Sequence, residues 1–269
     1  MSRKSKVLGL HDINAEKWHK LIYVHRNSRG GSCVNGEDAV LSIRAAGEEA
    51  GAGGFAIILP PGLCASDGDF LAVNSGETML RVEENSLVRV VCPGFIGASN
   101  AVAAMRPISA GVLTVSDKGS RGEREDTAGP ALKDLASAIG AVVEKTGILP
   151  DDRAEIAQKL IEWSDADELN LILTTGGTGL SARDVTPEAI MDVHDRISPG
   201  FGEVMRARAM MYTERGFLSR CLAATRKKTL IIAFPGSERA VRQCFEAIAP
   251  ALRHGVETLC GWDSECGGH

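Results

Sequence analysis

The residues best suited to chemistry lie in one stretch of the second half of the chain, Leu169 to Ile190. An apolar run, Leu171 to Leu173, breaks there at a turn of small residues, Thr174 to Gly179, and Asp184 follows shortly after. Glycines let the backbone approach a ligand closely, and the N–H groups of such a turn can bind an anion. A nearby carboxylate is what a magnesium–phosphate site requires. The pattern favours a phosphate-bearing ligand, although glycine-rich turns also serve as plain connections between strand and helix.

Three further loops carry carboxylates, hydroxyls or glycine directly after a predicted strand. They are Ser116-Asp117 with Asp126, then Pro150-Asp151-Asp152, and finally Pro235-Gly236-Ser237. The carboxyl ends of parallel strands lie at one edge of a sheet, where ligands bind, so these loops are expected to meet the glycine turn. The alternative is structural, since turns favour Gly, Asp and Ser in any α/β domain.

Two aspartates stand out as metal ligands. Asp152 and Glu155 have the spacing of a helix capping box, which leaves Asp151 outside the helix and free to face the site. With Asp184, it could hold a magnesium ion that bridges the phosphates of ATP. The alternative for Asp184 is an exposed ion pair with Arg183, which would contribute little energy.

Strands and helices alternate from Ala110 onward. Strands are expected at 111–116, 141–149, 169–175 and 229–234, and helices at 130–139, 152–163, 187–196, 200–215 and 238–259. Thr186 is expected to cap the third helix, with Pro187 in its first turn. Such alternation predicts a parallel sheet with helices on both faces. The predicted fold class is α/β: a three-layer domain over residues 109–269, preceded by a smaller β-rich domain over residues 1–108.

The first 108 residues contain short apolar runs separated by turn signals, with one helix expected near Glu37–Ala50. Parts of this region resemble a MOSC domain, a module of molybdenum cofactor sulfuration. The matching pieces are Gly54-Phe55-Ala56, Gly62-Leu63, Gly68-Asp69 and residues 77–82. The resemblance departs at Ile57-Ile58, and only Cys92 could correspond to that family's key cysteine. The alternative is an unrelated β domain in which Cys92 is a small buried hydrophobe.

Composition excludes several classes of protein. The net charge of −5 argues against a general nucleic-acid binder, and because charges balance within residues 1–108, the whole deficit lies in 109–269. An anionic ligand must therefore be bound by local donors and a metal. Seven scattered cysteines without a CxxC suit reduced thiols, and the six histidines lack a zinc-site spacing. No signal peptide or membrane-spanning run is apparent, so a cytoplasmic location is expected.

Several pieces of the second half, taken together and in order, resemble the MogA/MoaB family of molybdenum cofactor biosynthesis. They are LTVSDKGSRGEREDTAGPAL, LPDD, LTTGGTGLSARDVTPEA, SPGFGEVMR, LSR and AFPGS. The resemblance is closest to the molybdopterin adenylyltransferases. It departs at Ala223 to Lys227, where the family has an AGIRG-like run, and the missing glycine puts the geometry of that loop in question.

The resemblance implies an enzyme. In that family the terminal phosphate of molybdopterin attacks the α-phosphate of ATP, with Mg²⁺, giving adenylyl-molybdopterin and pyrophosphate. The catalytic and metal-binding positions of the family fall on Asp151 and Asp184. The implied substrate-binding residues are Ser116, Asp117, Thr175, Gly176, Gly177, Thr178, Gly179, Ser219, Arg220, Pro235, Gly236 and Ser237. The resemblance also implies a homotrimer and a molybdenum-insertion protein as partner.

Two alternative functions stay open. One is a non-catalytic, MoaB-like protein that binds molybdopterin without transferring AMP. The other is the CinA-like branch, which acts on pyridine nucleotides. The presence of both Asp151 and Asp184 favours the enzyme over the binder, and the string RDVTPEA argues against the CinA-like branch.

Overall fold

The structure, a computed structural model, describes the backbone of residues 6–7, 9–12, 21–26, 32–34, 37–38, 40–45, 54–59, 65–73, 78–97 and 101–262. The chain divides into two compact units, Met1–Pro107 and Ile108–His269, each described here by itself. No helix in these ranges is long and apolar enough to cross a membrane.

The first unit is built of β-strands in two sheets. The larger sheet has the order β1 (Lys6–Val7), β12 (Ala101–Met105), β8 (Phe70–Val73), β9 (Thr78–Glu83), β10 (Leu87–Cys92), β6 (Val40–Ala45), β7 (Gly54–Leu59), β2 (Gly9–Asp12). The smaller has the order β11 (Gly94–Gly97), β3 (Leu21–Arg26), β4 (Ser32–Val34), β5 (Glu37–Asp38). A single 3₁₀ turn, η2 (Glu84–Ser86), joins β9 to β10. Ile57, Leu71, Leu80 and Val90 are fully buried in this unit.

The helix expected near Glu37–Ala50 is wrong where the backbone is described. Residues 37–38 and 40–45 form β5 and β6 instead, and β6 pairs in parallel with β7. The β-branched Val40 and Ile43 favour an extended backbone, and the pairing with β7 outweighs the helical propensity of the neighbouring residues. Residues 46–50 lie outside the described ranges, as do parts of the pieces that resemble a MOSC domain.

The second unit contains one six-stranded sheet. Its order is β14 (Ala141–Leu149), β13 (Ile108–Val115), β15 (Leu171–Thr175), β18 (Thr229–Phe234), β17 (Ala223–Arg226), β16 (Arg196–Ile197). The first four strands are parallel, as expected from the alternation of strands and helices. The last two, β17 and β16, add an antiparallel edge that the sequence did not predict. The sheet is therefore mixed but mostly parallel.

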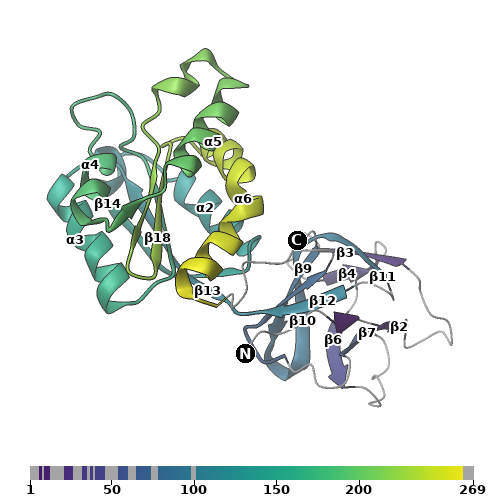
Figure 1. The fold of residues 1–269 in the computed structure, drawn as a ribbon. Coiled ribbons are helices and arrows are strands. Elements are labelled where there is room, and N and C mark those ends of the chain that lie inside the picture. The colour runs from purple at the N-terminus through teal and green to yellow at the C-terminus, as the bar shows by residue number, and fades with distance from the viewer. Residues whose placement is uncertain are drawn as a thin grey trace. The chain divides into compact units, whose positions relative to one another are not determined.

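Helices cover both faces of this sheet, which confirms the three-layer architecture (Figure 1). On one face lie α2 (Ala128–Ser137), α5 (Pro199–Met210) and α6 (Glu238–Cys260), with Leu132, Met205 and Phe245 in the core. On the other lie α3 (Arg153–Ile161), the π-helical turn η3 (Glu162–Ala166) and α4 (Thr186–Val193), with Ile156, Trp163 and Ile190 in the core. The short elements are α1 (Asp117–Ser120) and η4 (Glu214–Leu218).

Two predicted helix ends were wrong. The helix expected to reach Arg196 ends at Val193, because Arg196 and Ile197 pair with β17. The helix expected to reach Arg215 ends at Met210, and η4 follows. The final helix, in contrast, continues through Pro250, which is exposed.

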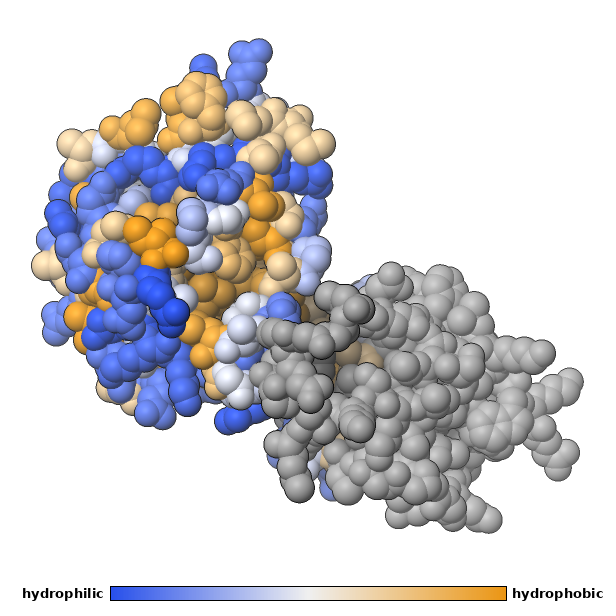
Figure 2. Space-filling model, in the orientation of Figure 1, coloured by the Kyte–Doolittle hydropathy of each residue, from blue (hydrophilic) through white to orange (hydrophobic). Residues whose placement is uncertain are grey.

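The segment around η4 gathers exposed apolar side chains. Met211 is 73% exposed and Phe217 61% exposed, with Met210, Tyr212 and Leu218 beside them in sequence. Figure 2 shows apolar groups at the end of the unit that carries this segment. We call these five residues the α5–η4 apolar surface.

The hairpin between β17 and β18 forms without the glycine that the family has there. Lys227 takes the left-handed conformation, with φ of 50°, that glycine adopts most easily. Its N–H donates to the Asp195 carboxylate at 2.6 Å, which helps to hold the turn. The β17–β18 hairpin therefore forms with lysine at this position.

The centre of the sheet is packed tightly around Gly111 of β13. A Cβ added at this position would lie 2.6 Å from Cε3 of Trp163 and 2.9 Å from Cδ1 of Leu169. Both side chains are buried in the core on the α3–α4 face. Glycine is therefore required here by the approach of the indole ring, not by backbone conformation.

We expect Gly111→Ala to lower the free energy of unfolding by about 1–3 kcal/mol, the usual cost of overpacking a core. Gly200→Ala is the matched control, because a Cβ there meets nothing within 4 Å and the residue lies in the first turn of α5. Urea denaturation followed by far-UV circular dichroism measures both, since α1–α6 all lie in the second unit. Equal stability of the two variants would contradict the packing argument.

Candidate functional site

The four parallel strands bring their carboxyl ends to one edge of the sheet, and a pocket of about 250 Å³ lies there. Residues from all four following loops line it, as the switch-point argument predicted. The lining residues are Thr114, Val115, Ser116, Gly119, Arg124, Glu125, Asp126, Thr127, Ala128, Asp151, Thr175, Gly176, Gly177, Asp184 and Gly236.

The structure brings only part of the predicted set together in this pocket. The predicted residues that line it are Asp151, Asp184, Ser116, Thr175, Gly176, Gly177 and Gly236. Those that do not are Asp117, Thr178, Gly179, Ser219, Arg220, Pro235 and Ser237. The second group supports the walls of the pocket through hydrogen bonds described below.

The glycine turn folds directly over the end of β13. Gly176 and Gly177 have φ of 97° and 62°, values that favour glycine. A Cβ on Gly176 would lie 2.1 Å from the carbonyl oxygen of Val115, and one on Gly177 would lie 2.4 Å from Oγ1 of Thr186. No side chain fits at either position, so the turn places bare backbone at the pocket wall.

Thr186 serves this turn instead of capping its own helix, which corrects the expected N-cap. Val185 occupies the N-cap position of α4, and Thr186 is the first helical residue. The Thr186 hydroxyl donates to the carbonyl of Gly176 at 2.8 Å, in a buried hydrogen bond. This bond gives the carbonyl a partner, and a buried carbonyl without one would be costly.

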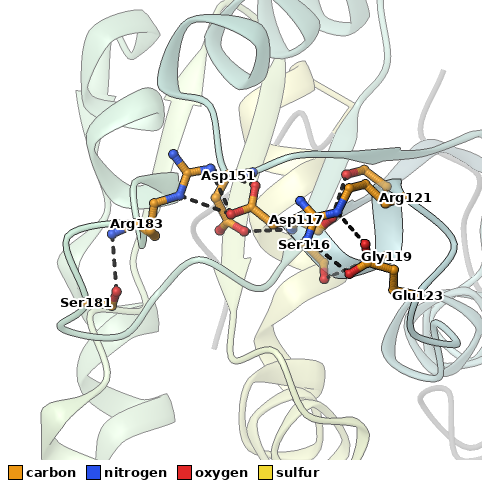
Figure 3. A network of polar contacts seen from close by, with 9 residues as sticks. Ser116, Asp117, Gly119, Arg121, Glu123, Asp151, Ser181 and Arg183 are labelled. Carbon is orange, nitrogen blue, oxygen red and sulfur yellow. Dashed lines mark hydrogen bonds and ion pairs between the residues drawn. The ribbon is translucent and has the colours of Figure 1, made fainter.

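Asp151 is held by a reciprocal pair of hydrogen bonds with Asp117 (Figure 3). The Asp117 N–H donates to Oδ2 of Asp151 at 2.9 Å, and the Asp151 N–H donates to Oδ1 of Asp117 at 3.1 Å. Burial raises the pKa of Asp151 above its usual value, against the lowering effect of the Asp117 N–H. Asp152 accepts from the N–H groups of Ala154 and Glu155, so its expected capping role is confirmed.

Asp184 ends a short loop and lines the pocket, and its carboxylate also bonds to that loop. Its Oδ2 accepts from the Ser181 N–H at 2.9 Å, and a Cβ on Gly179 would lie 2.8 Å from the same oxygen. The expected alternative, an ion pair with Arg183, is wrong among the contacts described. Arg183 instead reaches Asp117, with Nη2 2.7 Å from Oδ1 and Nε 3.0 Å from Oδ2 (Figure 3).

The Arg183–Asp117 pair ties the loop of Asp184 to that of Asp117, which is in turn bonded to Asp151. Hydrogen bonding to Arg183 holds the pKa of Asp117 below its usual value, so Asp117 stays ionised and neutralised by the guanidinium. Asp117 therefore orients Asp151 and anchors Arg183, and does not itself line the pocket.

Thr175, which lines the pocket, and several of the predicted residues outside it also have structural partners. Thr175 donates to the carbonyl of Pro235 at 2.7 Å, and Ser237 accepts from the Ala240 N–H as the N-cap of α6. Ser219 contacts the sulfur of Cys221, and Thr178 is buried beside β18. Arg220 bonds to the loop that carries Asp184.

One wall of the pocket consists of Thr114 and residues 124–128, of which the sequence analysis had named only Asp126. Asp126 accepts from the Thr114 hydroxyl at 2.7 Å and from the N–H groups of Ala128 and Gly129, so it caps α2. An aspartate just before a helix carries a cap signal that sequence reasoning could have used. Arg124 carries no comparable signal, because its place depends on how a polar loop folds back over β13.

Asp151 and Asp184 are near enough for the charge of Asp184 to contribute to the raised pKa of Asp151. Paired carboxylates with oxygen donors suit Mg²⁺, which binds through one or two carboxylates and takes its other ligands from phosphates and water. Among the described residues no group of three His, Cys, Asp or Glu side chains could hold a metal without such help. The donor set therefore fits a magnesium ion that arrives with a phosphorylated substrate.

A family model described as "Probable molybdopterin binding domain" matches residues 111–254. The molybdopterin adenylyltransferase of Helicobacter pylori J99 is 39% identical over 159 residues, which cover 58% of this chain and 90% of that protein. The molybdenum cofactor biosynthesis protein B of Escherichia coli K12 is 40% identical over 150 residues, covering 54% and 86%.

Solved structures agree with these relatives. MoaB from Thermus thermophilus matches with a TM-score of 0.55 and 42% identity, over 57% of this chain and 97% of that one. The tungsten cofactor synthesizing MoaB from Pyrococcus furiosus matches with a TM-score of 0.52 and 34% identity, over 58% and 99%. A glycine turn over β13, two aspartates at one sheet edge and a family match over more than half of the sequence lead to one conclusion: the chain belongs to the MogA/MoaB family of molybdopterin-binding proteins of molybdenum cofactor biosynthesis.

Proposed function

We propose that the second unit catalyses the Mg²⁺-dependent adenylylation of molybdopterin by ATP, giving adenylyl-molybdopterin and pyrophosphate. The observation that carries this proposal is that Asp151 and Asp184, from the ends of β14 and β15, line the same pocket as the bare backbone of the glycine turn. The similarity to relatives named molybdopterin adenylyltransferase supports the same reaction.

The proposed reaction needs no nucleophilic side chain from the protein. The attacking group is a phosphate of the substrate, so positioning and charge neutralisation are what this chain must supply. Asp151 and Asp184 would hold the Mg²⁺, which neutralises charge on the phosphates when bound. The Gly176–Gly177 backbone and the Ser116 hydroxyl can orient phosphate oxygens, and Arg124 adds a cation at the pocket wall.

The size of the pocket fits the reacting groups only. At about 250 Å³ it is smaller than the roughly 300–1,000 Å³ of pockets that enclose whole drug-sized ligands. We therefore place the phosphates of both substrates inside it, with the adenosine and the pterin extending along the surrounding loops.

A second candidate is a protein that binds molybdopterin without transferring AMP. The 40% identity to molybdenum cofactor biosynthesis protein B of Escherichia coli is the observation in its favour. Isothermal titration with molybdopterin, compared with turnover in the presence of ATP and Mg²⁺, separates the two functions.

Our proposal extends to the rest of the protein. We place the reaction in the cytoplasm, as the scattered cysteines without a CxxC favour. Residues 1–108 would form a MOSC-like domain. A molybdenum-insertion protein would receive the product.

Asp184→Asn should lower adenylyl transfer at least about 100-fold, because changes to the outer shell of a metal site already cost about 10–100-fold. The amide can still accept from the Ser181 N–H, so the loop should keep its shape. Pyrophosphate release with molybdopterin and MgATP measures the effect. Asp192→Asn is the control, because Asp192 lies in α4, the helix that follows the loop of Asp184, and forms an exposed pair with Arg153. Unchanged turnover in Asp184→Asn would remove the metal role.

We expect adenylyl transfer to be lost at acidic pH because Asp151 becomes protonated. Burial disfavours its ionised form, so its pKa is raised, and metal-binding capacity is lost as the pH falls through that raised value. For the same reason, the ionised carboxylate of Asp151 lowers the stability of the folded state at pH values above that raised pKa. Asp151→Asn should therefore abolish adenylyl transfer at pH 8 while keeping or raising the urea midpoint of unfolding. At acidic pH the midpoints of the wild-type protein and of Asp151→Asn should converge. A strongly lowered midpoint at pH 8 would make Asp151 a structural residue.

We further propose that copies of the chain form a trimer through the α5–η4 apolar surface. Five neighbouring exposed apolar or aromatic side chains on a short protruding segment are typical of an interface, because single proteins rarely leave such a cluster in water.

Light scattering at micromolar concentration should give the mass of three chains for the wild-type protein. The double variant Met211→Lys, Phe217→Lys should give a smaller mass, because two charges would then have to be buried in the contact. Leu87→Lys is the control, since Leu87 is 43% exposed in the first unit. A monomeric wild-type protein would reject the trimer.

A further inference from the structure

Arg220 is the residue whose observed place differs most from its expected role. It was expected to bind substrate, yet it does not line the pocket. Its guanidinium turns instead toward residues 179–188, the segment that carries Asp184. Nε donates to the carbonyl of Gly179 at 2.6 Å, Nη2 donates to the carbonyl of Asp184 at 2.5 Å, and Nη1 pairs with the Glu188 carboxylate.

The contacts made by Arg220 mark both ends of one loop. Gly179, the last residue of the glycine turn, begins the 179–184 loop, and Asp184 ends that loop. Glu188 lies in the first turns of α4. The backbone N–H of Arg220 also donates to the carbonyl of Thr178 at 2.9 Å. One residue therefore fixes the distance across the loop and attaches the loop to the helix behind it.

The loop has few local contacts that could replace this clamp. Leu180, within it, is 68% exposed. The loop's own hydrogen bonds, such as the Asp184 N–H to the carbonyl of Ser181 at 3.0 Å, join residues two or three apart and do not attach it to the rest of the unit. On the pocket side it is tied by the Arg183–Asp117 pair, whose arginine is 65% exposed.

We propose that Arg220 is a positioning residue that holds the 179–184 loop so that the Asp184 carboxylate faces the pocket. It acts through that loop and contacts neither substrate. The proposal rests on the proposed function for its catalytic consequence, while the clamp itself follows from the contacts of Arg220 alone.

The geometry of the side chain explains why arginine is needed. Gly179, Asp184 and Glu188 accept from three different nitrogens of one planar fork. A lysine carries a single ammonium on a flexible stem and cannot reach all three acceptors together. Arg220→Lys therefore keeps the charge and removes the fixed geometry.

Arg226, the last residue of β17, offers a matched control because it also bonds to α4. Its Nε and Nη2 pair with Asp165, and its Nη1 donates to the carbonyl of Val193 at the other end of α4. Its side chain is 21% exposed, against 30% for Arg220. Arg226→Lys thus breaks an equivalent set of bonds away from the pocket, and it reports the cost to the fold alone.

The experiment measures two quantities on the full chain. The first is the Mg²⁺ concentration that gives half-maximal adenylyl transfer at saturating ATP and molybdopterin. It should rise about 10–100-fold in Arg220→Lys, as for other outer-shell changes at metal sites, with the KM for molybdopterin little changed. The second is amide hydrogen exchange in peptides that cover residues 179–184, which should become faster. Arg226→Lys should change neither quantity, and Glu188→Gln, which keeps an acceptor, should change both in the same direction but less.

Two results would overturn the proposal. If Arg220→Lys changed neither the Mg²⁺ response nor the amide hydrogen exchange, the 179–184 loop would keep its position without Arg220. A raised KM for ATP or molybdopterin with an unchanged Mg²⁺ response would make Arg220 a substrate ligand. If the wild-type protein transfers no AMP, the proposed function fails, and faster exchange in Arg220→Lys alone still establishes the clamp.

Discussion

The close approach of the Gly176–Gly177 turn to the end of β13 is the constraint on which the site depends. With Gly176 so near the carbonyl of Val115, the backbone leaving β15 can cross the neighbouring strand without a side chain in between. This crossing leaves backbone groups exposed at the pocket wall and starts the path that leads to Asp184. Any residue with a Cβ would push the turn away from β13 and open the pocket between Ser116 and Gly236.

Some carboxylates at the pocket are occupied by partners within the protein, and others remain available to bind a cation. Asp117 is neutralised by Arg183, and Asp126 accepts from the first N–H groups of α2. Asp151 and Asp184 have only backbone N–H partners among the hydrogen bonds described. An acidic unit can therefore still receive an anionic substrate, provided that a cation enters with it, because the free carboxylates then bind the cation and the turn binds the anion.

Arginines hold the loops of this unit in place more than they line the pocket. Arg183 joins the loop of Asp184 to that of Asp117, Arg220 clamps the loop from behind, and Arg226 attaches the edge of the sheet to the far end of α4. Each uses several nitrogens to reach acceptors far away in sequence, which a planar fork does well. The loops can thus be rich in glycine and small residues without being loose.

The sequence by itself determined the alternation of strands and helices in the second unit, the strands β14 and β18, the cap at Asp152 and the meeting of four strand-end loops. These features follow from local hydrophobic periodicity, capping chemistry and the shared direction of parallel strands. It failed for β5 and β6, for the ends of α4 and α5, and for the antiparallel edge, where pairing between distant segments overrides local propensity. Only the tertiary structure decided which polar residues line the pocket and which support it. Arg183 contacts Asp117, and Arg220 contacts the loop of Asp184, because the folded strands bring these distant segments together. No local sequence pattern predicts these partners.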